Sequence, residues 1–232
     1  MVLSPDLLKV ASLIGDPSRL AMLLNLLGGK SLPAGELARS AQVSPQTAST
    51  HLAKLVNGGL LIQESFGRHK YFRLASSEVG HALESLHTIA PSRPIRSLRE
   101  SNEVHALQFA RTCYDHLAGK IGVALTDRLL EMNFIEESGK DFTLSSAGKA
   151  RLQAFGVTVE KSQKSRRRFA CQCLDWSERR CHLAGSLGAS LTMRLFELKW
   201  IERYPNGRAV RITEAGIKGL FEEFGLSVIT GQ

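Results

Sequence analysis

Apolar residues recur at helical spacing in several short stretches of the first ninety residues, and each stretch has a recognisable start. Serine and aspartate side chains cap helix N-termini, and proline is compatible with the first helical turn. Glycine pairs such as Gly28-Gly29 and Gly58-Gly59 end such stretches. Helices are therefore expected to begin at Ser4-Pro5, Asp16-Pro17, Pro33 or Ala34, Ser44-Pro45 and Ser77.

The stretch from Ser44 to Asn57 has an unusual polarity for a helix. Leu52, Leu55 and Val56 supply an apolar stripe that can pack on a core. The positions before and beside this stripe carry mainly short polar side chains: Gln46, Thr47, Ser49, Thr50 and His51. Such side chains can hydrogen-bond the edges of base pairs at close approach in the DNA major groove.

A hairpin follows this helix in the sequence "LLIQESFGRHKYFRL". Two β-like arms meet near Gly67-Arg68, so that Arg68, His69 and Lys70 lie at the tip, within reach of a phosphate or the minor groove. A short helix, a turn, a polar helix and a basic hairpin together predict a winged helix-turn-helix. The predicted DNA-binding residues are Ser44, Gln46, Thr47, Ser49, Thr50, His51, Lys54, Arg68, His69 and Lys70.

The second half of the chain contains an internal repeat. "HLAGKIGVALTDRLLEMNFIEE" at His116 matches "HLAGSLGASLTMRLFELKWIER" at His182, and each copy leads into a β-like pair and a closing helix. The expected fold is mainly α (α+β), with two tandem shortened winged-helix-like repeats after the DNA-binding domain. Because prolines interrupt "APSRP", the expected domains are 1–90 and 98–232, joined by a linker at 91–97.

Composition narrows the class of protein. The net charge of +8 favours a polyanionic partner, although a solvated surface is the favoured interpretation of the basic run at 161–168. No apolar run is long enough to span a bilayer and the N-terminus lacks a signal pattern, so we expect a cytoplasmic protein with no membrane partner. Without a phosphate-binding glycine loop, a nucleophile elbow or a zinc-hydrolase motif, we expect no enzyme.

The first ninety residues resemble the ArsR/SmtB family of regulators. The resemblance is carried by "LIGDPSRLAMLLNLL", "GELARSAQVSPQTASTHLAKLVNGGLL" and "GRHKYFRL", in that order. It implies a homodimeric repressor that binds an operator palindrome in double-stranded DNA and is released by a ligand. The terminal helices, about Pro5–Leu13 and Ser77–Ile89, would form the dimer interface. Their apolar residues are Leu7, Leu8, Leu13, Val79, Leu83 and Leu86.

The familiar metal-ligand sets of that family are missing from the first domain. "GELARSA" contains no cysteine, and Glu78, His81 and His87 do not have the spacing of the zinc sensors. We therefore expect no required cofactor. Soft ligands are concentrated in the second domain, where the candidate effector residues are Cys113, His116, Cys171, Cys173, Cys181 and His182. These side chains suit a buried core, a metal or thiol-redox sensor, or contacts to an organic ligand. In a strand, Cys171 and Cys173 would point to the same side, which suits a shared metal or oxidation of the two thiols.

The sequence predicts a DNA-binding transcriptional regulator, with three forms left open. It is a ligand-responsive repressor, a metal-responsive or thiol-redox regulator that uses the cysteines and histidines, or a DNA- or partner-binding protein without a ligand. Trp176 is expected in the core, with stacking on a planar ligand as the alternative.

Overall fold

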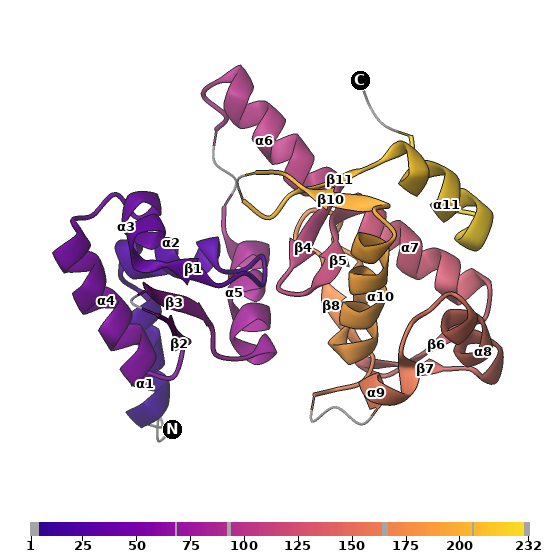
Figure 1. Cartoon of the computed structure of the whole chain (residues 1–232), viewed down its shortest axis with the longest axis horizontal. Helices are drawn as coiled ribbons and strands as arrows, with labels where there is room; N and C mark the ends of the chain where they lie inside the picture. The colour runs from indigo at the N-terminus through magenta and orange to yellow at the C-terminus, as the bar shows by residue number, and fades with distance from the viewer. Residues whose placement is uncertain (1–4, 68, 92–93, 164–166, 206, 230–232) are drawn as a thin grey trace. The chain divides into compact units, whose positions relative to one another are not determined.

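The computed structural model describes residues 5–67, 69–91, 94–163, 167–205 and 207–229, which form two compact units (Figure 1). Unit 1 is Met1–Leu86 and unit 2 is His87–Gln232. Among the described residues, every helix is too short or too polar to cross a lipid bilayer.

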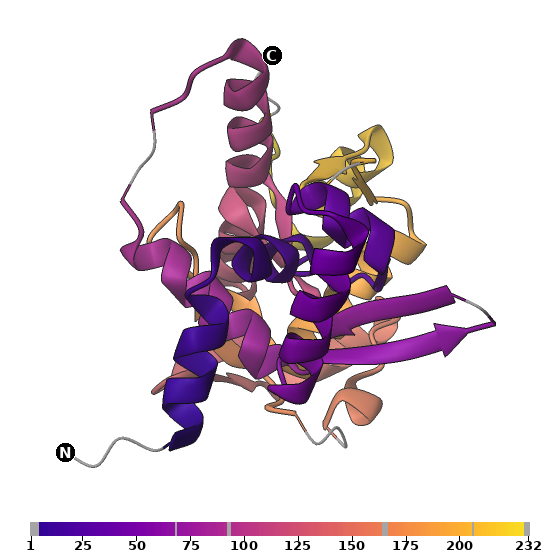
Figure 2. The same cartoon turned by 90° about the vertical axis from the view of Figure 1, so that its left-hand side faces the viewer.

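Unit 1 is built from short helices and one small sheet. Its elements are α1 (Pro5–Ile14), α2 (Pro17–Asn25), β1 (Leu32–Pro33), α3 (Ala34–Ser40), α4 (Pro45–Asn57), β2 (Leu61–Phe66), β3 (His69–Leu74) and α5 (Ser77–Ile89), whose last turn extends into unit 2. The sheet is antiparallel in the order β1-β3-β2. Figure 2 shows the β2–β3 hairpin extending away from the helices of this unit. The winged helix-turn-helix is confirmed.

The helix starts follow the expected chemistry. The side chain of Asp16 accepts a hydrogen bond from the amide of Arg19 at 2.9 Å, and Ser44 accepts one from the amide of Thr47 at 3.2 Å. Each cap is followed by a proline in the first helical turn. Capping of this kind stabilises a helix by about 1 kcal/mol.

Arg19 holds the N-terminal helices around α4. Its guanidinium donates hydrogen bonds to the carbonyls of Leu13 and Ser12, both at 2.8 Å, and lies 3.4 Å from Nδ1 of His51. Gly58, directly after α4, permits this close packing because a Cβ there would lie 2.2 Å from the side chain of Leu13. These contacts fix α4 against α1 and α2.

The apolar face expected for dimerisation is smaller than the sequence indicated. Leu13 and Leu83 are buried within the single chain, so the expectation that they lie on an interface is corrected. Leu7, Leu8 and Leu86 remain exposed, and Val79 is half-buried. Periodicity placed these residues on apolar faces but could not decide which of them the monomer itself covers.

Unit 2 alternates hairpins and helices after an initial helix α6 (Leu98–Phe109). Its first half contains β4 (Arg111–Cys113), β5 (His116–Ala118), α7 (Gly119–Glu131), β6 (Ile135–Ser138), β7 (Asp141–Leu144), α8 (Ser146–Ala154) and α9 (Val159–Gln163). Its second half contains β8 (Cys171–Leu174), β9 (Cys181–Ala184), α10 (Gly185–Glu197), β10 (Ile201–Arg203), β11 (Val210–Ile212) and α11 (Glu214–Phe224). Four strands form a sheet in the order β6-β7-β8-β9, and β4-β5 and β10-β11 pair separately.

The two halves of unit 2 make reciprocal hydrogen bonds. Thr126 on α7 accepts a bond from the amide of Leu183 at 2.9 Å, and Thr192 on α10 accepts one from the amide of Leu117 at 2.8 Å. Two arginines 66 positions apart behave alike, because Arg128 donates to Phe224 O at 2.8 Å and Arg194 donates to Phe155 O at 2.9 Å. Each half therefore completes hydrogen bonds of the other.

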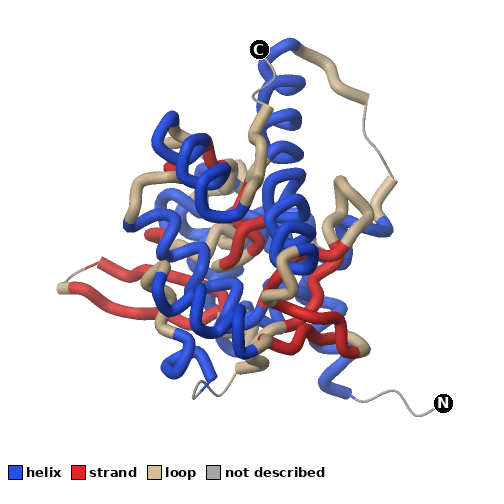
Figure 3. Tube along the Cα trace, turned by 90° about the vertical axis from the view of Figure 1, so that its right-hand side faces the viewer, coloured by secondary structure: helices blue, strands red, loops and turns tan. Residues whose placement is uncertain are grey.

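The second half has the expected helices but contains more strands than the two β-like pairs that the sequence predicted. The whole structure is mixed helix and sheet, as the alternation of helices and strands in Figure 3 shows. The repeated His-Leu-Ala lies in strands β5 and β9, and the helices begin at the glycines that follow. Gly119 and Gly185 have φ of 78° and 80°, a left-handed conformation that other residues rarely adopt.

Candidate functional site

The exposed face of α4 carries the side chains expected to read DNA. Ala48, Leu52 and Leu55 are buried and attach the helix to the core of unit 1. Gln46, Thr47 and six other candidates are exposed, namely Ser44, Ser49, Thr50, Lys54, His69 and Lys70. The helix contains no acidic residue, so no side chain on it repels a phosphate backbone.

Five of the candidate side chains on α4 and its cap are already engaged within the unit. The hydroxyls of Ser44 and Thr47 lie 2.8 Å apart and share a hydrogen bond. The hydroxyl of Ser49 donates to Pro45 O at 2.9 Å, and the hydroxyl of Thr50 donates to Gln46 O at 3.3 Å. Their oxygens can still accept a hydrogen bond, but their protons are used. His51 is half-buried against Arg19, so its ring is placed to support the helix rather than to reach a base edge.

The hairpin places basic side chains at its far end. His69 pairs across the strands with Phe66, and Lys70 pairs with Ser65. Both His69 and Lys70 are exposed. Arg68, the third expected contact of this hairpin, lies outside the described residues.

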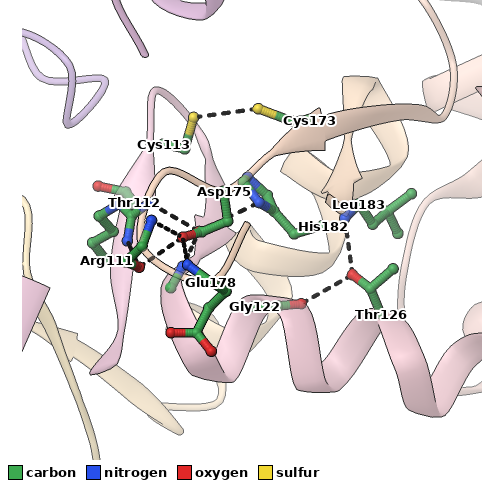
Figure 4. A network of polar contacts seen from close by, with 12 residues as sticks. Arg111, Thr112, Cys113, Gly122, Thr126, Cys173, Asp175, Glu178, His182 and Leu183 are labelled. Carbon is green, nitrogen blue, oxygen red and sulfur yellow. Dashed lines mark hydrogen bonds and ion pairs between the residues drawn. The ribbon is translucent and has the colours of Figure 1, made fainter. Parts of the chain in front are cut away.

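Unit 2 gathers four of the six candidate effector residues in its interior. One ligand-type atom from each of Cys113, His116, Cys173 and His182 lies within 4.8 Å of the others. Figure 4 shows Cys113 and Cys173 facing one another, with their sulfurs 3.8 Å apart. No member of this group, which we call the Cys/His cluster, exposes more than 8% of its surface.

Strand register explains how the Cys/His cluster forms. In the β4–β5 hairpin Cys113 is the direct partner of His116, and in the β8–β9 hairpin Cys173 is the direct partner of His182. Directly opposed residues of antiparallel strands place their side chains on the same face. Each half of unit 2 thus supplies one cysteine and one histidine, and the two imidazole rings lie 5.1 Å apart between centroids.

Each histidine of the cluster has an aspartate beside its Nδ1 atom. Asp115 lies 3.4 Å from Nδ1 of His116, and Asp175 lies 3.5 Å from Nδ1 of His182. Burial opposes the charged form of both rings. It lowers the pKa of His182, whereas hydrogen bonds to Asp115 and Cys173 overcome it and raise the pKa of His116.

The two clustered thiols differ in their electrostatic surroundings. The hydrogen bond between them raises the pKa of Cys113 and lowers that of Cys173. Burial raises the pKa of both thiols, but the neighbouring His116 and His182 rings favour the thiolate of Cys173 further and lower its pKa. Cys173 is therefore the thiol of this pair that more readily carries negative charge.

Asp175 also belongs to a buried ion pair with Arg111. Their side chains are fully buried and lie 2.9 Å apart (Figure 4). Burial acts to raise the pKa of Asp175, but the Arg111 charge and hydrogen bonds from Ser177 and the Gly119 amide lower it to about 2. The guanidinium of Arg111 also lies over the ring of Trp176, 4.5 Å from its centroid.

Cys171 and Cys181 do not join the cluster. Cys171 is buried on the same side of β8 as Cys173, as its strand position predicted, and Cys181 is half-buried one residue before His182. The expected pairing of Cys171 with Cys173 as co-ligands therefore gives way to a pairing across hairpins. The spacing Cys113-x-x-His116 was the available sequence signal, because a two-residue turn places these positions opposite each other.

The basic run at 161–168 is used partly within unit 2. Arg167 pairs with Asp115, and Arg168 pairs with Asp141. Lys161 is exposed on α9, and residues 164–166 lie outside the described part of the chain. Neutralised arginines contribute less to attraction of a polyanion than the net charge suggested.

Known proteins similar to this chain share its N-terminal motif or most of its length. Residues 14–64 match the family model described as a helix-turn-helix domain. A Bacillus subtilis (strain 168) protein, described as an uncharacterized HTH-type transcriptional regulator YdfF, is 46% identical over 214 residues. The match covers 92% of this chain and 95% of that protein.

Solved structures of smaller proteins are also similar to part of the chain. HlyU from Vibrio cholerae N16961 is 28% identical, with a TM-score of 0.34, over 36% of this chain and 90% of that chain. NolR from Sinorhizobium fredii is 25% identical, with a TM-score of 0.35, over 40% of this chain and 99% of that chain.

Proposed function

Since the chain belongs to the HTH-type transcriptional regulators, a DNA-binding class, and its first ninety residues resemble the ArsR/SmtB family, we propose that it binds a palindromic operator as a homodimer and represses transcription there. The observation that carries this proposal is the exposed polar face of α4, capped by Ser44 and flanked by a basic hairpin. A surface of this kind has more hydrogen-bonding groups than folding of the unit requires.

The recognition step is assigned to the first two turns of α4. Gln46 and Thr47 are exposed there, and the groups of Gln46 can form paired hydrogen bonds with adenine in the major groove. Lys54 and Lys70 supply positive charge for phosphates. His51 and Arg19 hold the helix at its angle, so they act on DNA binding indirectly.

The experiment selects the preferred duplex from a random pool with the full chain, then measures binding by variants. Replacing Gln46 with Ala should cost about 1–3 kcal/mol on the selected site and much less on a scrambled duplex. Gln153→Ala, an exposed glutamine of α8 in unit 2, is the matched control and should bind normally. Failure of the full chain to select any sequence would refute the proposal.

The dimer interface is proposed on the exposed part of α1 and α5. Leu7 and Leu8 expose 56% and 54% of their surface, and Leu86 exposes 38%. A second copy of the chain would cover them and double the number of half-sites contacted. Sedimentation of a Leu8→Lys variant should give a monomer with weakened operator binding, whereas Met193→Lys, an equally exposed change in unit 2, should leave the dimer intact.

Control by an effector is proposed to enter through unit 2. Unit 1 contains no cysteine, and the buried cysteines Cys113, Cys171 and Cys173 lie in unit 2. An effector that favours one dimer arrangement by about 1–3 kcal/mol would change operator affinity several-fold or more.

Repression itself is tested with a reporter gene placed behind the selected operator. The chain should repress this gene, and substitutions in α4 should relieve the repression. Activation by the intact chain would contradict repression without contradicting DNA binding.

We also infer that the two halves of unit 2 are copies of one ancestral module. The matching sequence segments, the common order of strands and helices, and the reciprocal bonds of Thr126 and Thr192 support this inference.

A further inference from the structure

We propose that the Cys/His cluster of unit 2 is a tetrahedral binding site for one thiophilic divalent cation, with Zn²⁺ as the best-suited ion. Cys113 and His116 would bind it from the first half of the unit, and Cys173 and His182 from the second. This site goes beyond the proposed operator binding and does not depend on it.

The distances within the cluster are close to those of a tetrahedral zinc site. Zinc binds thiolate sulfur at about 2.3 Å and imidazole nitrogen at about 2.0–2.1 Å, so ligand atoms of a regular tetrahedron lie about 3.3–3.8 Å apart. The two sulfurs are already 3.8 Å apart, and all four ligand atoms lie within 4.8 Å of one another. Shifts of about 1 Å or less would complete the geometry.

The charge of the proposed site suits a buried position. Two thiolates balance the charge of a divalent cation, and neutral imidazoles add none, so the bound site has no net charge to desolvate. His182 exposes 1% of its surface, and its Nε2 atom has no hydrogen-bond partner of normal geometry among the described residues. A buried polar atom without such a partner is costly, and a metal bond would satisfy it.

The aspartates beside the histidines complete a pattern typical of metal sites. Histidines that bind metal through one ring nitrogen usually donate a hydrogen from the other to a carboxylate, which fixes the ring orientation. Asp115 is hydrogen-bonded to Nδ1 of His116, and Asp175 lies 3.5 Å from Nδ1 of His182, where a small rotation of the ring would complete the bond. Both carboxylates lie at Nδ1, which leaves Nε2 for the ion. Asp115 and Asp175 are positioning residues in this arrangement.

The proposed site lies between the two halves of unit 2, so a bound ion would stabilise the contact between them. Each ligand pair comes from a separate hairpin, and β5 and β9 are the strands whose amides donate the reciprocal bonds to Thr192 and Thr126. An ion held by all four side chains would join the two halves at their shared centre. Because it binds the folded protein alone, saturating metal raises the unfolding temperature of unit 2.

The first measurement uses the full chain, reduced and stripped of metal by a chelator. Zinc titrated in competition with a chromophoric chelator should bind tightly with one equivalent per chain. Cobalt(II) should give the intense visible bands of a tetrahedral ion and a sulfur-to-metal charge-transfer band sized for two thiolates. X-ray absorption of the zinc-loaded protein should show two sulfur and two nitrogen ligands at about 2.3 and 2.0 Å.

Variants then test which side chains bind. Cys113→Ser and Cys173→Ser should each weaken zinc affinity by more than about 100-fold, and Asp115→Asn by about 10–100-fold. The matched controls are Cys171→Ser and Cys181→Ser, which remove thiols outside the cluster and should retain wild-type affinity. Circular dichroism establishes that each variant is folded, and the wild-type cobalt spectrum tests the site even where a variant is not.

Several results would overturn the proposal. One is reduced wild-type protein that binds no zinc in competition with the chelator, and another is a cobalt spectrum without thiolate bands. Equal loss of affinity in Cys171→Ser and Cys113→Ser would also overturn it. If mild oxidant instead joins Cys113 to Cys173 while zinc fails to bind the reduced form, the pair is a redox switch and not a metal site.

Discussion

The two units place their polar side chains in opposite ways. Among the described residues, unit 1 buries two polar or charged side chains, Ser77 and Glu84, and displays the polar face of α4 to solvent. Unit 2 buries nine, including the ion pair of Arg111 with Asp175 and both histidines of the cluster. Exposed polar groups need no protein partner, whereas buried ones must be paired. The polar side chains of unit 1 are therefore available on its surface to bind a partner, whereas those of unit 2 mainly bind one another in its interior.

The largest expected effect comes from breaking the buried ion pair of unit 2. Asp175→Ala leaves the guanidinium of Arg111 buried without its carboxylate, which should reduce the free energy of unfolding of unit 2 by about 3–5 kcal/mol. Denaturant unfolding followed by tryptophan fluorescence measures it, because Trp176 and Trp200 are both in unit 2. Glu64→Ala removes a partly exposed pair with Arg73 in unit 1 and should cost at most about 1 kcal/mol, measured by circular dichroism because both tryptophans are in unit 2.

A smaller decrease in the free energy of unfolding should follow from replacing Thr126 or Thr192, the two threonines that accept hydrogen bonds from the other half of unit 2. Thr126→Val leaves the amide of Leu183 without its acceptor, and Thr192→Val does the same to Leu117. Leaving either buried amide without an acceptor should reduce the free energy of unfolding by about 1–3 kcal/mol. The same fluorescence assay applies, and the two losses should be similar. A loss in one variant alone would show that the halves are not equivalent in stability.

Removal of two serine helix caps, one on α4 in unit 1 and one on α6 in unit 2, tests whether α4 contributes to DNA binding as well as to stability. Ser44→Ala and Ser97→Ala each remove an exposed serine cap, from α4 and α6, and each should cost about 1 kcal/mol in helix stability. Hydrogen exchange of the first-turn amides should increase in both. Only Ser44→Ala should also weaken operator binding. Equal binding by both variants would argue against α4 as the recognition helix.

The smallest expected effect is a change in salt dependence. Replacing Lys70 with Ala removes one expected phosphate contact, so affinity should fall alike for operator and scrambled duplexes. The slope of log affinity against log salt should become shallower by about 0.9. Lys218→Ala, an exposed change on α11, should leave the slope unchanged. Loss of operator affinity alone would assign Lys70 to base recognition instead.

The sequence by itself determined the local elements of unit 1. Asp16-Pro17, Ser44-Pro45 and the hairpin pattern of 61–74 are short-range signals, and the structure has the expected helices and strands at those positions. The polar face of α4 could be deduced for the same reason, since helical periodicity assigns residues to faces. The half-buried position of His51 and the full burial of Leu83 could not be deduced, because they depend on which elements pack against those faces.

Only the tertiary structure decided which soft side chains of unit 2 come together. The sequence presented six candidates, and local spacing favoured Cys171 with Cys173 because alternate residues of a strand share a face. The register of two hairpins far apart in the chain instead opposes Cys113 to His116 and Cys173 to His182. Packing of the two halves then joins the pairs. Contacts between distant strands depend on pairing and packing across the whole unit, which no short segment encodes.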